Sequence, residues 1–326
     1  MQSKIFNKAN FKLWSKLGMR ATFGIAAMEL GNKVDKLMIL TGDVSTSAGL
    51  DRFKKKFPDK YLDVGIAEQN LIGIGAGLAS EGFNVISTTF APFQTMRCCE
   101  QIKVNLGYMK QKISMVGLAS GLALGTLGYT HCCIEDVGIL RSIPNLTIIS
   151  PADSGEAVKA VFASLKHKNS VYIRLTGDAN IDQIYDDDYE FEIGKSITLK
   201  KGKDISIFAA GTMNKVALDC SKILSQNNID AEVINMHTIK PIDFEKIKDS
   251  AKNSKLIISI EEHNIIGGLG SAVAESLAKI NNSPEQMFFG IKDTYSEGGE
   301  YSFLKEKFNL IPNKISEKIM LKLKEI

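Results

Sequence analysis

The chain has 326 residues, 24% of them charged, and a formal net charge of +3, which excludes the strongly basic profile of a nucleic-acid-binding protein. Its length fits two domains, each large enough to bury a core of its own. Five cysteines in two adjacent pairs and a singleton match neither a zinc site nor a disulfide framework, so we expect a cytoplasmic protein.

Neither a signal peptide nor a membrane span is expected. The chain starts with polar, Asn- and Lys-rich residues, and we expect Met1 to be a natural beginning. Residues 113–134 lack Asp, Glu, Lys and Arg, but they contain four glycines and His131. A glycine-permitted loop that approaches a ligand is a better interpretation than a lipid-facing helix.

Apolar, β-rich runs alternate with helical patterns through the first half of the chain. The expected strands lie at 37–40, 61–64, 85–88, 113–118, 146–149 and 171–174. The expected helices lie at 67–80, 92–106, 134–142 and 153–166. This alternation predicts an α/β domain whose parallel sheet is covered by helices on both faces, a doubly wound arrangement.

A polar, acidic stretch around Asp187 separates this region from a second one. From about Asp204 the alternation restarts, with strands expected at 205–209, 231–235 and 256–260. The predicted organisation is an N-terminal extension at 1–18, a first domain at 19–178, a linker at 179–203 and a second doubly wound domain at 204–326.

Glu68 lies at a predicted strand-to-helix junction, in the segment 63–70 (DVGIAEQN). In open α/β sheets such junctions lie at the carboxyl ends of strands, where ligands bind. The helix dipole alone would also favour a carboxylate there. The segment resembles the activating glutamate region of transketolases and related thiamine diphosphate enzymes. The resemblance implies that Glu68 contacts the ring nitrogen of the cofactor's aminopyrimidine and promotes its imino form.

A second segment, 89–97 (TFAPFQTMR), carries two phenylalanines three residues apart. On a helical turn Phe90 and Phe93 can face one side, as two ordinary core residues also would. The spacing resembles the transketolase segment whose aromatic side chains stack on the cofactor's pyrimidine. Met96 falls where that family usually has a tyrosine, and its sulfur can pack on a π face. The resemblance implies that Phe90, Phe93 and Met96 bind the cofactor.

His131 belongs to the segment 128–145 (GYTH followed by RSIPN), the third match. This segment resembles the Gly-x-Thr-His region of transketolases and deoxyxylulose-phosphate synthases. A histidine in a glycine-rich loop can exchange a proton with a substrate oxygen near neutral pH. The structural alternative is a histidine satisfied by backbone carbonyls. We expect His131 to be catalytic, since it lies inside the motif.

The expected substrate pocket differs from that of the family. Arg20 and Arg174 fall where transketolases place phosphate-binding arginines, although either residue is equally consistent with a surface or salt-bridging role. Leu127 stands where the family has an aspartate that binds a sugar hydroxyl, and Ala119 where it has a histidine near the substrate phosphate. The cofactor pocket thus resembles the family while the substrate pocket is altered, and the donor and acceptor sugars stay open.

The diphosphate-binding half of a thiamine diphosphate site is not evident in the sequence. Related enzymes bind diphosphate and Mg²⁺ through a Gly-Asp-Gly motif, usually on another subunit. Gly42-Asp43-Val44 lacks the second glycine, and Gly177-Asp178-Ala179 lies in a different context. We expect no metal ligands here. The resemblance implies thiamine diphosphate as cofactor, with diphosphate and Mg²⁺ held by an N-terminal transketolase subunit in an α2β2 heterotetramer.

The resemblance covers the chain from about Met19 to its last helices. It implies a pyrimidine-binding domain at 19–178 and a transketolase C-terminal domain at 204–326. The leading prediction is the carboxy-terminal subunit of a split transketolase, which transfers a two-carbon ketol unit between sugars. The alternatives are the beta subunit of a 2-oxo-acid dehydrogenase, a deoxyxylulose-phosphate-synthase-like carboligase, and a non-catalytic domain pair. Glu68 argues against the last of these.

Overall fold

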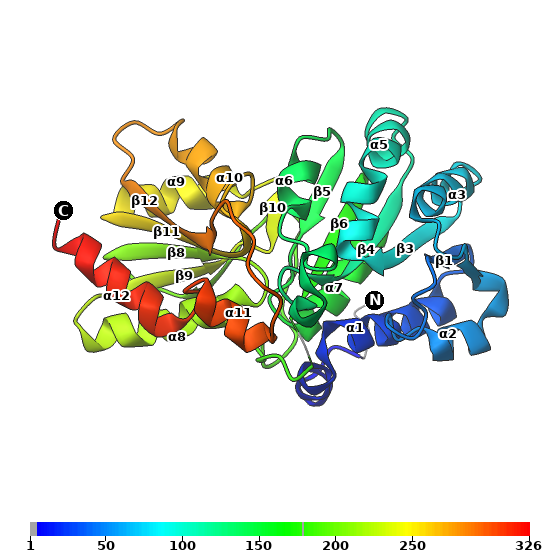
Figure 1. Cartoon of the computed structure of the whole chain (residues 1–326), viewed down its shortest axis with the longest axis horizontal. Coiled ribbons are helices and arrows are strands. Elements are labelled where there is room, and N and C mark those ends of the chain that lie inside the picture. Colours follow the sequence, from blue (N-terminus) through cyan, green and yellow to red (C-terminus); the bar gives the residue numbers. More distant parts are fainter. Residues whose placement is uncertain (1–4, 178) are drawn as a thin grey trace.

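The computed structural model describes residues 5–177 and 179–326, so the expectations that concern Met1 and Asp178 lie outside the described residues. Figure 1 shows two lobes side by side, each built from a sheet with helices packed against it. Within the described ranges, no helix is long and apolar enough to cross a membrane.

A seven-stranded sheet forms the centre of the first lobe, in the order β10-β5-β6-β4-β3-β1-β2. Its strands are β1 (Leu37–Thr41), β2 (Tyr61–Asp63), β3 (Asn84–Phe90), β4 (Ile113–Ser120), β5 (Leu146–Ile149), β6 (Ser170–Thr176) and β10 (Thr238–Lys240). Neighbours pair in parallel except β10, which comes from the second half of the chain and pairs antiparallel with β5. All six strands predicted for the first domain are confirmed, and β10 was not predicted.

Helices cover both faces of this sheet. They are α1 (Lys8–Lys33), α2 (Asp51–Lys56), α3 (Glu68–Ser80), α4 (Ala91–Gln94), α5 (Cys99–Gln101), α6 (Asp136–Arg141) and α7 (Ser154–Lys166). Four further helical segments are not α-helical: η1 (Pro58–Lys60), η2 (Met96–Cys98), η3 (Ile102–Tyr108) and η4 (Gly125–Thr130). The helix expected at 92–106 is therefore broken into α4, η2, α5 and η3.

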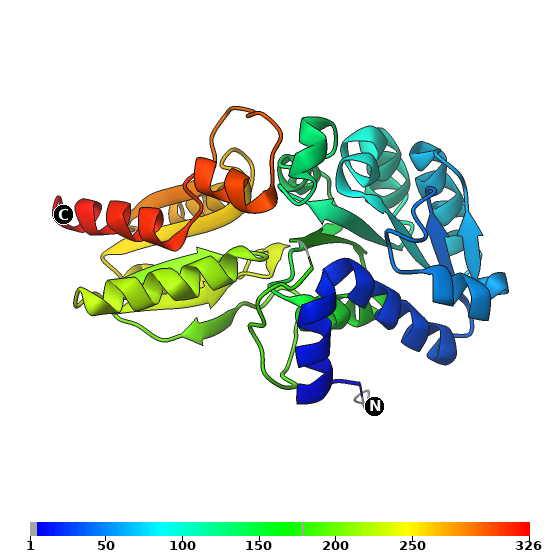
Figure 2. The same ribbon diagram turned by 60° about the horizontal axis from the view of Figure 1, so that its bottom comes forward.

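Helix α1 begins inside the stretch expected to be an N-terminal extension. Its N-cap Asn7 accepts a hydrogen bond from the amide of Asn10 at 3.0 Å, which satisfies an otherwise unpaired donor. Phe11 and Trp14 are buried in the apolar cluster that also covers the sheet of the first lobe. Gly18, at φ 77°, interrupts the helix, and Figure 2 shows the resulting bend of α1 in blue. The helix packs against α7. The first turns of α1 are therefore part of the first lobe and not a separate extension.

A five-stranded sheet forms the second lobe, in the order β12-β11-β8-β9-β7. Its strands are β7 (Ile197–Lys200), β8 (Ile205–Ala209), β9 (Ala231–Asn235), β11 (Leu256–Asn264) and β12 (Glu285–Ile291). The helices of this lobe are α8 (Met213–Gln226), α9 (Phe244–Asn253), α10 (Leu269–Leu277), α11 (Tyr301–Lys307) and α12 (Pro312–Leu323). The three strands expected here are confirmed. The antiparallel edge strand β7 lies in the expected linker.

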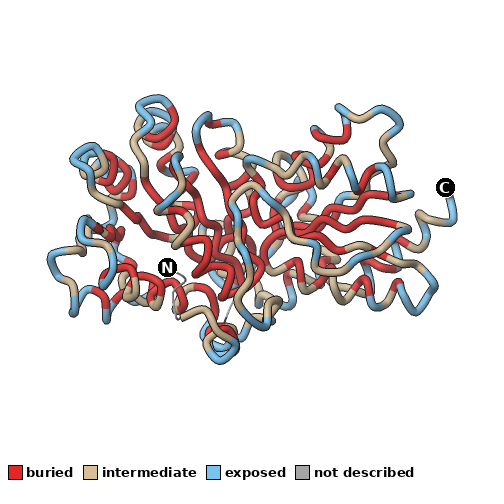
Figure 3. The backbone as a smooth tube through the Cα atoms, turned by 180° about the vertical axis from the view of Figure 1, so that it is seen from behind, coloured by how far each residue is buried: buried red, intermediate tan, exposed pale blue. Residues whose placement is uncertain are grey.

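The carboxyl ends of the two sheets meet between the lobes. The amide of Ser150, just after β5, donates to His237 O, and Ser150 O accepts from Gly211, just after β8. Buried apolar residues of both lobes, including Tyr172 and Phe208, belong to one continuous cluster. Figure 3 shows buried strands converging on this junction from both sides. Loops that follow strands of either sheet can therefore contact one another across it.

Candidate active site

The turn that leads into α3 is fixed by Asp63, the last residue of β2. Its Oδ1 accepts from the backbone amides of Asp43 at 2.9 Å and Gly65 at 3.0 Å. Burial alone would raise the pKa of Asp63, but these hydrogen bonds outweigh it and lower the pKa. Asp43 itself is exposed and takes a left-handed φ of 60°, consistent with turn chemistry. The ends of β1 and β2 are thereby tied together just before Glu68.

Glu68 is the first residue of α3, and only 4% of its surface is exposed. A buried carboxylate is costly unless it is paired. Nη1 of Arg97 lies 2.8 Å from Oε1 of Glu68 and supplies that charge partner. The guanidinium carbon of Arg97 also lies 3.9 Å from the centre of the Phe93 ring, a cation–π contact. A planar, hydrogen-bonding group therefore stacks on Phe93 and donates to Glu68.

Three rings form a wall beside this carboxylate. The centres of Phe90 and Phe93 are 6.4 Å apart at an interplanar angle of 85°, an edge-to-face arrangement. The imidazole of His131 lies 5.4 Å from the Phe93 ring and 6.2 Å from the Phe90 ring. The structure therefore brings together Glu68, Phe90, Phe93 and His131, although they come from three separate segments.

The side chain of His131 contacts the hydroxyl of Thr130. The oxygen of this hydroxyl lies 3.2 Å from Leu127 O and 3.0 Å from Nδ1 of His131. When the hydroxyl donates its single proton to Leu127 O, Nδ1 is the donor to the Thr130 oxygen. In the neutral ring Nε2 then carries the lone pair. This nitrogen is the one that can accept a proton from a bound molecule.

Other expected site residues do not join this cluster. Met96 is 37% exposed, and Leu127, in η4, is 54% exposed. Arg20 lines a different cavity of about 210 Å³, together with Ser47 and Gly177. The cofactor and substrate roles expected for these three residues stay predictions.

Arg174 is buried, which does not support the expected contact with a substrate phosphate. Its Nε lies 2.9 and 3.0 Å from the two carboxylate oxygens of Asp136, and its Nη2 donates to the carbonyls of Cys133 and Glu262. Burial alone would lower the pKa of Arg174, but the charge of Asp136 raises it, so the guanidinium stays protonated. Here it joins the first lobe to the second.

The cysteines near the cluster, Cys98 and Cys132, are buried. Burial raises the pKa of Cys98 to about 12, and the neighbouring charge of Glu68 adds to this effect. Burial likewise raises the pKa of Cys132 to about 11. All five cysteines of the chain are free thiols. Burial therefore disfavours a thiolate at both Cys98 and Cys132.

Sequence reasoning missed Arg97, which the fold places against both Glu68 and Phe93. The sequence places Arg97 four residues after Phe93 in a helical segment, which indicates that the two side chains can meet. Its ion-pair partner, Glu68, lies 29 positions earlier, and no local pattern indicates that contact. Across residues 5–177 and 179–326 there is no group of three or more His, Cys, Asp or Glu side chains able to hold a metal ion.

Residues 15–179 match the family model of the transketolase pyrimidine-binding domain, and residues 194–315 match that of the transketolase C-terminal domain. The chain belongs to the transketolase family. Membership in this family implies thiamine diphosphate as cofactor, and the predicted pair of α/β domains is confirmed.

Relatives of this transketolase chain are similar over most of their length. A Methanocaldococcus jannaschii protein provisionally named a transketolase C-terminal section is 36% identical and covers 94% of this chain and 97% of its own. The 6-deoxy-6-sulfo-D-fructose transketolase subunit of a Clostridium species is also 36% identical, over 91% of this chain and 92% of its own.

A solved structure agrees with these relatives. A split-gene transketolase, solved as an inactive β4 tetramer, superposes with a TM-score of 0.86 at 34% identity, over 93% of this chain and 97% of that one. The chain is therefore a transferase subunit that corresponds to the carboxy-terminal part of a split transketolase, as the sequence predicted.

Proposed function

We propose that this chain supplies the pyrimidine side of a thiamine diphosphate site and transfers a two-carbon ketol unit between sugars. The observation that carries the proposal is the buried carboxylate of Glu68. The planar guanidinium of Arg97 pairs with this carboxylate and also packs over the Phe93 ring. An aminopyrimidine is likewise planar, stacks on aromatic rings and forms hydrogen bonds at its edge. The carboxylate of Glu68 and the Phe93 ring therefore fit this part of the cofactor.

Glu68, Phe90 and Phe93 would hold the pyrimidine, with Met96 at its margin. When bound, thiamine diphosphate supplies the nucleophilic carbon for breaking and forming carbon–carbon bonds. The carboxylate of Glu68 holds the proton that is shared with the ring nitrogen. Arg97 leaves Phe93 when the pyrimidine enters, which its 44% exposed side chain permits. Nε2 of His131 takes a proton from a substrate oxygen and returns it.

A partner subunit would complete the site. Mg²⁺ and diphosphate need several oxygen ligands, and no cluster of three or more acidic, His or Cys side chains in the described parts of this chain could hold a metal. Relatives of similar length are named as transketolase subunits. We propose an N-terminal subunit with the diphosphate-binding domain, assembled with this chain as α2β2, the simplest closed arrangement. The free thiols fit a reducing cytoplasm.

Reconstitution tests this function. Purified alone, the chain should not transfer ketol units. Addition of the N-terminal transketolase subunit, thiamine diphosphate and Mg²⁺ should produce ketose-dependent transfer to an aldose acceptor. Activity with pyruvate as donor, but not with any ketose, would instead favour the deoxyxylulose-phosphate-synthase-like alternative, whose relatives are 30–31% identical to this chain.

The altered substrate pocket should make common pentose phosphates poor substrates. Leu127 and Ala119 lack the carboxylate and the imidazole expected in transketolases, and a sugar whose hydroxyl or phosphate finds no hydrogen-bond partner in the site is bound less well. We expect kcat/KM for xylulose phosphate to be about 10²-fold or more below that for the natural sugar. Two relatives are named for unusual sugars, 6-deoxy-6-sulfo-D-fructose and apulose-4-phosphate.

A single substitution provides the control for this prediction. Leu127 is exposed, so Leu127→Asp should leave the fold intact while it restores a carboxylate to the pocket. Steady-state kinetics of the reconstituted complex should then show improved turnover of the pentose phosphate. Efficient use of xylulose phosphate by the unmodified enzyme would contradict the prediction.

A further inference from the structure

The loop that carries His131, residues 121–135, is closed at its base within the first lobe. Gly121 and Cys133 exchange two backbone hydrogen bonds of 2.8 and 2.9 Å, an isolated antiparallel bridge just after β4. The residues between them therefore form a closed loop. We call residues 121–135, which include this loop and the two residues after it, the histidine loop. Its position depends on whatever packs against it beyond this bridge.

Both ends of the histidine loop are fixed by the second lobe. Leu122 and Ile134 are fully buried in the apolar cluster of the C-terminal domain rather than in that of the first sheet. The amide of Leu122 donates to Oε1 of Glu262 at 2.7 Å, and the carbonyl of Ile134 accepts from Asn264 at 2.8 Å. The end of β11 therefore anchors the two ends of the loop.

The histidine loop contacts the connection between β12 and α11, residues 292–300, which we call the strap. The hydroxyl of Tyr295 donates to Glu135, at the C-terminal end of the loop, at 2.8 Å. The Tyr295 ring lies 4.7 Å from that of Tyr129, which lies farther into the loop. The hydroxyls of Tyr129 and Ser296 are 3.2 Å apart. Figure 1 shows this connection, in orange to red, reaching the centre of the molecule beside the green segment.

The two backbones also touch directly. The amide of Gly299 donates to Gly125 O at 2.9 Å. A Cβ on Gly298 would lie 2.9 Å from the same carbonyl oxygen, so a side chain there would push the strap away from the loop. The strap therefore matches the loop in shape as well as in hydrogen bonding.

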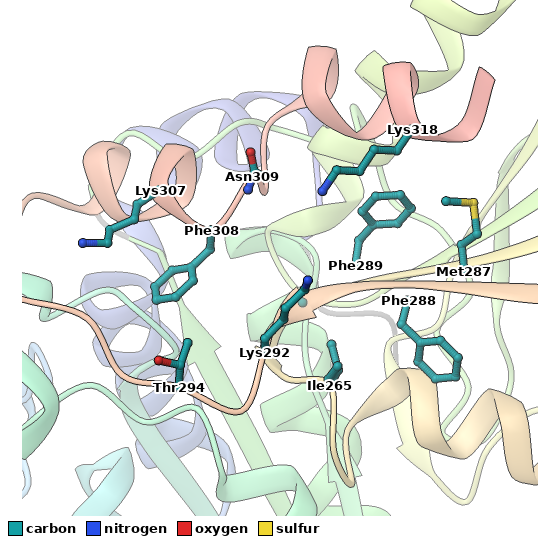
Figure 4. Close-up of a pocket in the computed structure, with 11 residues that line it drawn as sticks. Ile265, Met287, Phe288, Phe289, Lys292, Thr294, Lys307, Phe308, Asn309 and Lys318 are labelled. Carbon is teal, nitrogen blue, oxygen red and sulfur yellow. The ribbon is translucent and has the colours of Figure 1, made fainter. Parts of the chain in front are cut away.

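On its other side the strap is loosely packed. A cavity of about 390 Å³ lies between β12, the base of the strap and the turn after α11. Figure 4 shows Lys292 and Thr294 of the strap lining this cavity together with Phe308. An exposed ion pair between Glu297 and Lys307 ties the strap to α11. The contacts between the strap and the histidine loop therefore keep the strap in place, and the same contacts keep the loop in place.

We propose that the strap positions His131. The C-terminal domain then sets the geometry of an active site to which it contributes no catalytic group. Tyr295 and Tyr129 are then positioning residues. The proposal rests on the catalytic role of His131 proposed above. It predicts that loosening the strap moves the histidine loop while Glu68, Phe90 and Phe93 keep their places on the first lobe.

Hydrogen exchange on the isolated full-length chain tests the physical part of this inference. Tyr295 is 65% exposed, so Tyr295→Ala should leave the fold intact. We expect backbone amides of residues 122–132 to exchange about five- to tenfold faster, the effect of losing one hydrogen bond and one ring contact. Leu321→Ala, which truncates an exposed apolar residue of α12 in the same lobe, should leave their exchange unchanged. Unchanged exchange in Tyr295→Ala would overturn the inference.

Kinetics of the reconstituted complex then separate the inference from the proposed function. Tyr295→Ala should lower kcat about tenfold with little change in cofactor affinity, because the pyrimidine contacts are intact. Tyr295→Phe keeps the ring contact and should recover part of the loss. If exchange accelerates in Tyr295→Ala but kcat is unchanged, the strap positions the loop while His131 is not catalytic. That result would leave this inference standing and overturn the role proposed for His131.

Discussion

Glu68→Gln should abolish most of the activity of the assembled enzyme without disturbing its assembly. Glutamine keeps the shape of the side chain and can still accept the hydrogen bond from Arg97, but it cannot exchange a proton with the cofactor's ring nitrogen. We expect kcat to fall about 10²–10⁴-fold, the usual range for loss of a proton-transferring group. The isolated variant should fold normally, since a buried charge is replaced by a neutral group of the same size.

Two measurements on the reconstituted complex check this prediction. Exchange of the thiazolium C–H proton with solvent should slow together with turnover, whereas the size of the complex in solution should not change. Glu100→Gln is the matched control, because Glu100 is exposed on the same lobe and accepts a hydrogen bond from its sequence neighbour Gln101. Near-normal proton exchange and turnover in Glu68→Gln would remove Glu68 from its proposed role.

His131→Ala should lower kcat by about 10²–10⁴-fold if Nε2 exchanges a proton with a substrate oxygen. Affinity for thiamine diphosphate should change little, because Glu68 and the two phenylalanines stay in place. Steady-state kinetics with the natural sugar and calorimetric titration with the cofactor check the two halves of this prediction separately.

His167→Ala is a suitable control for this substitution. His167 follows α7 and contacts Thr147 at 3.0 Å, within the same lobe but outside the aromatic wall. Its replacement should leave kcat near that of the unmodified enzyme. A His131→Ala enzyme with an unchanged rate would mean that the imidazole serves only to pack against Phe93.

Most strands of both sheets could be predicted because buried parallel strands appear as continuous apolar runs between helices. The strands β7, β10 and β12 were missed. All three lie at sheet edges, and β7 and β10 are also short and contain lysine and threonine. Helix α1 was also missed. Polar residues surround Phe11 and Trp14, and Gly18 interrupts the helical pattern that would have revealed it.

The aromatic and carboxylate residues of the site were predicted from motifs that are local in sequence. The partner of Arg174 could not be predicted, because only the fold brings Asp136 against its guanidinium in the junction between the lobes. The contact of Tyr295 with Glu135 joins residues 160 positions apart, and no local pattern indicates such a pairing. The parts of the site that could not be predicted are therefore contacts between residues far apart in the sequence, within the first lobe for Arg97 and Glu68 and between the lobes for Tyr295 and Glu135.

Calorimetric titration with thiamine diphosphate in the presence of Mg²⁺ tests most directly whether this chain holds one half of a shared site. The chain alone should bind the cofactor weakly, since it offers the pyrimidine contacts without ligands for diphosphate and metal. Addition of the N-terminal transketolase subunit should raise the affinity by about 100-fold or more, as both halves of the cofactor become bound. Equally tight binding by the chain alone would contradict the account.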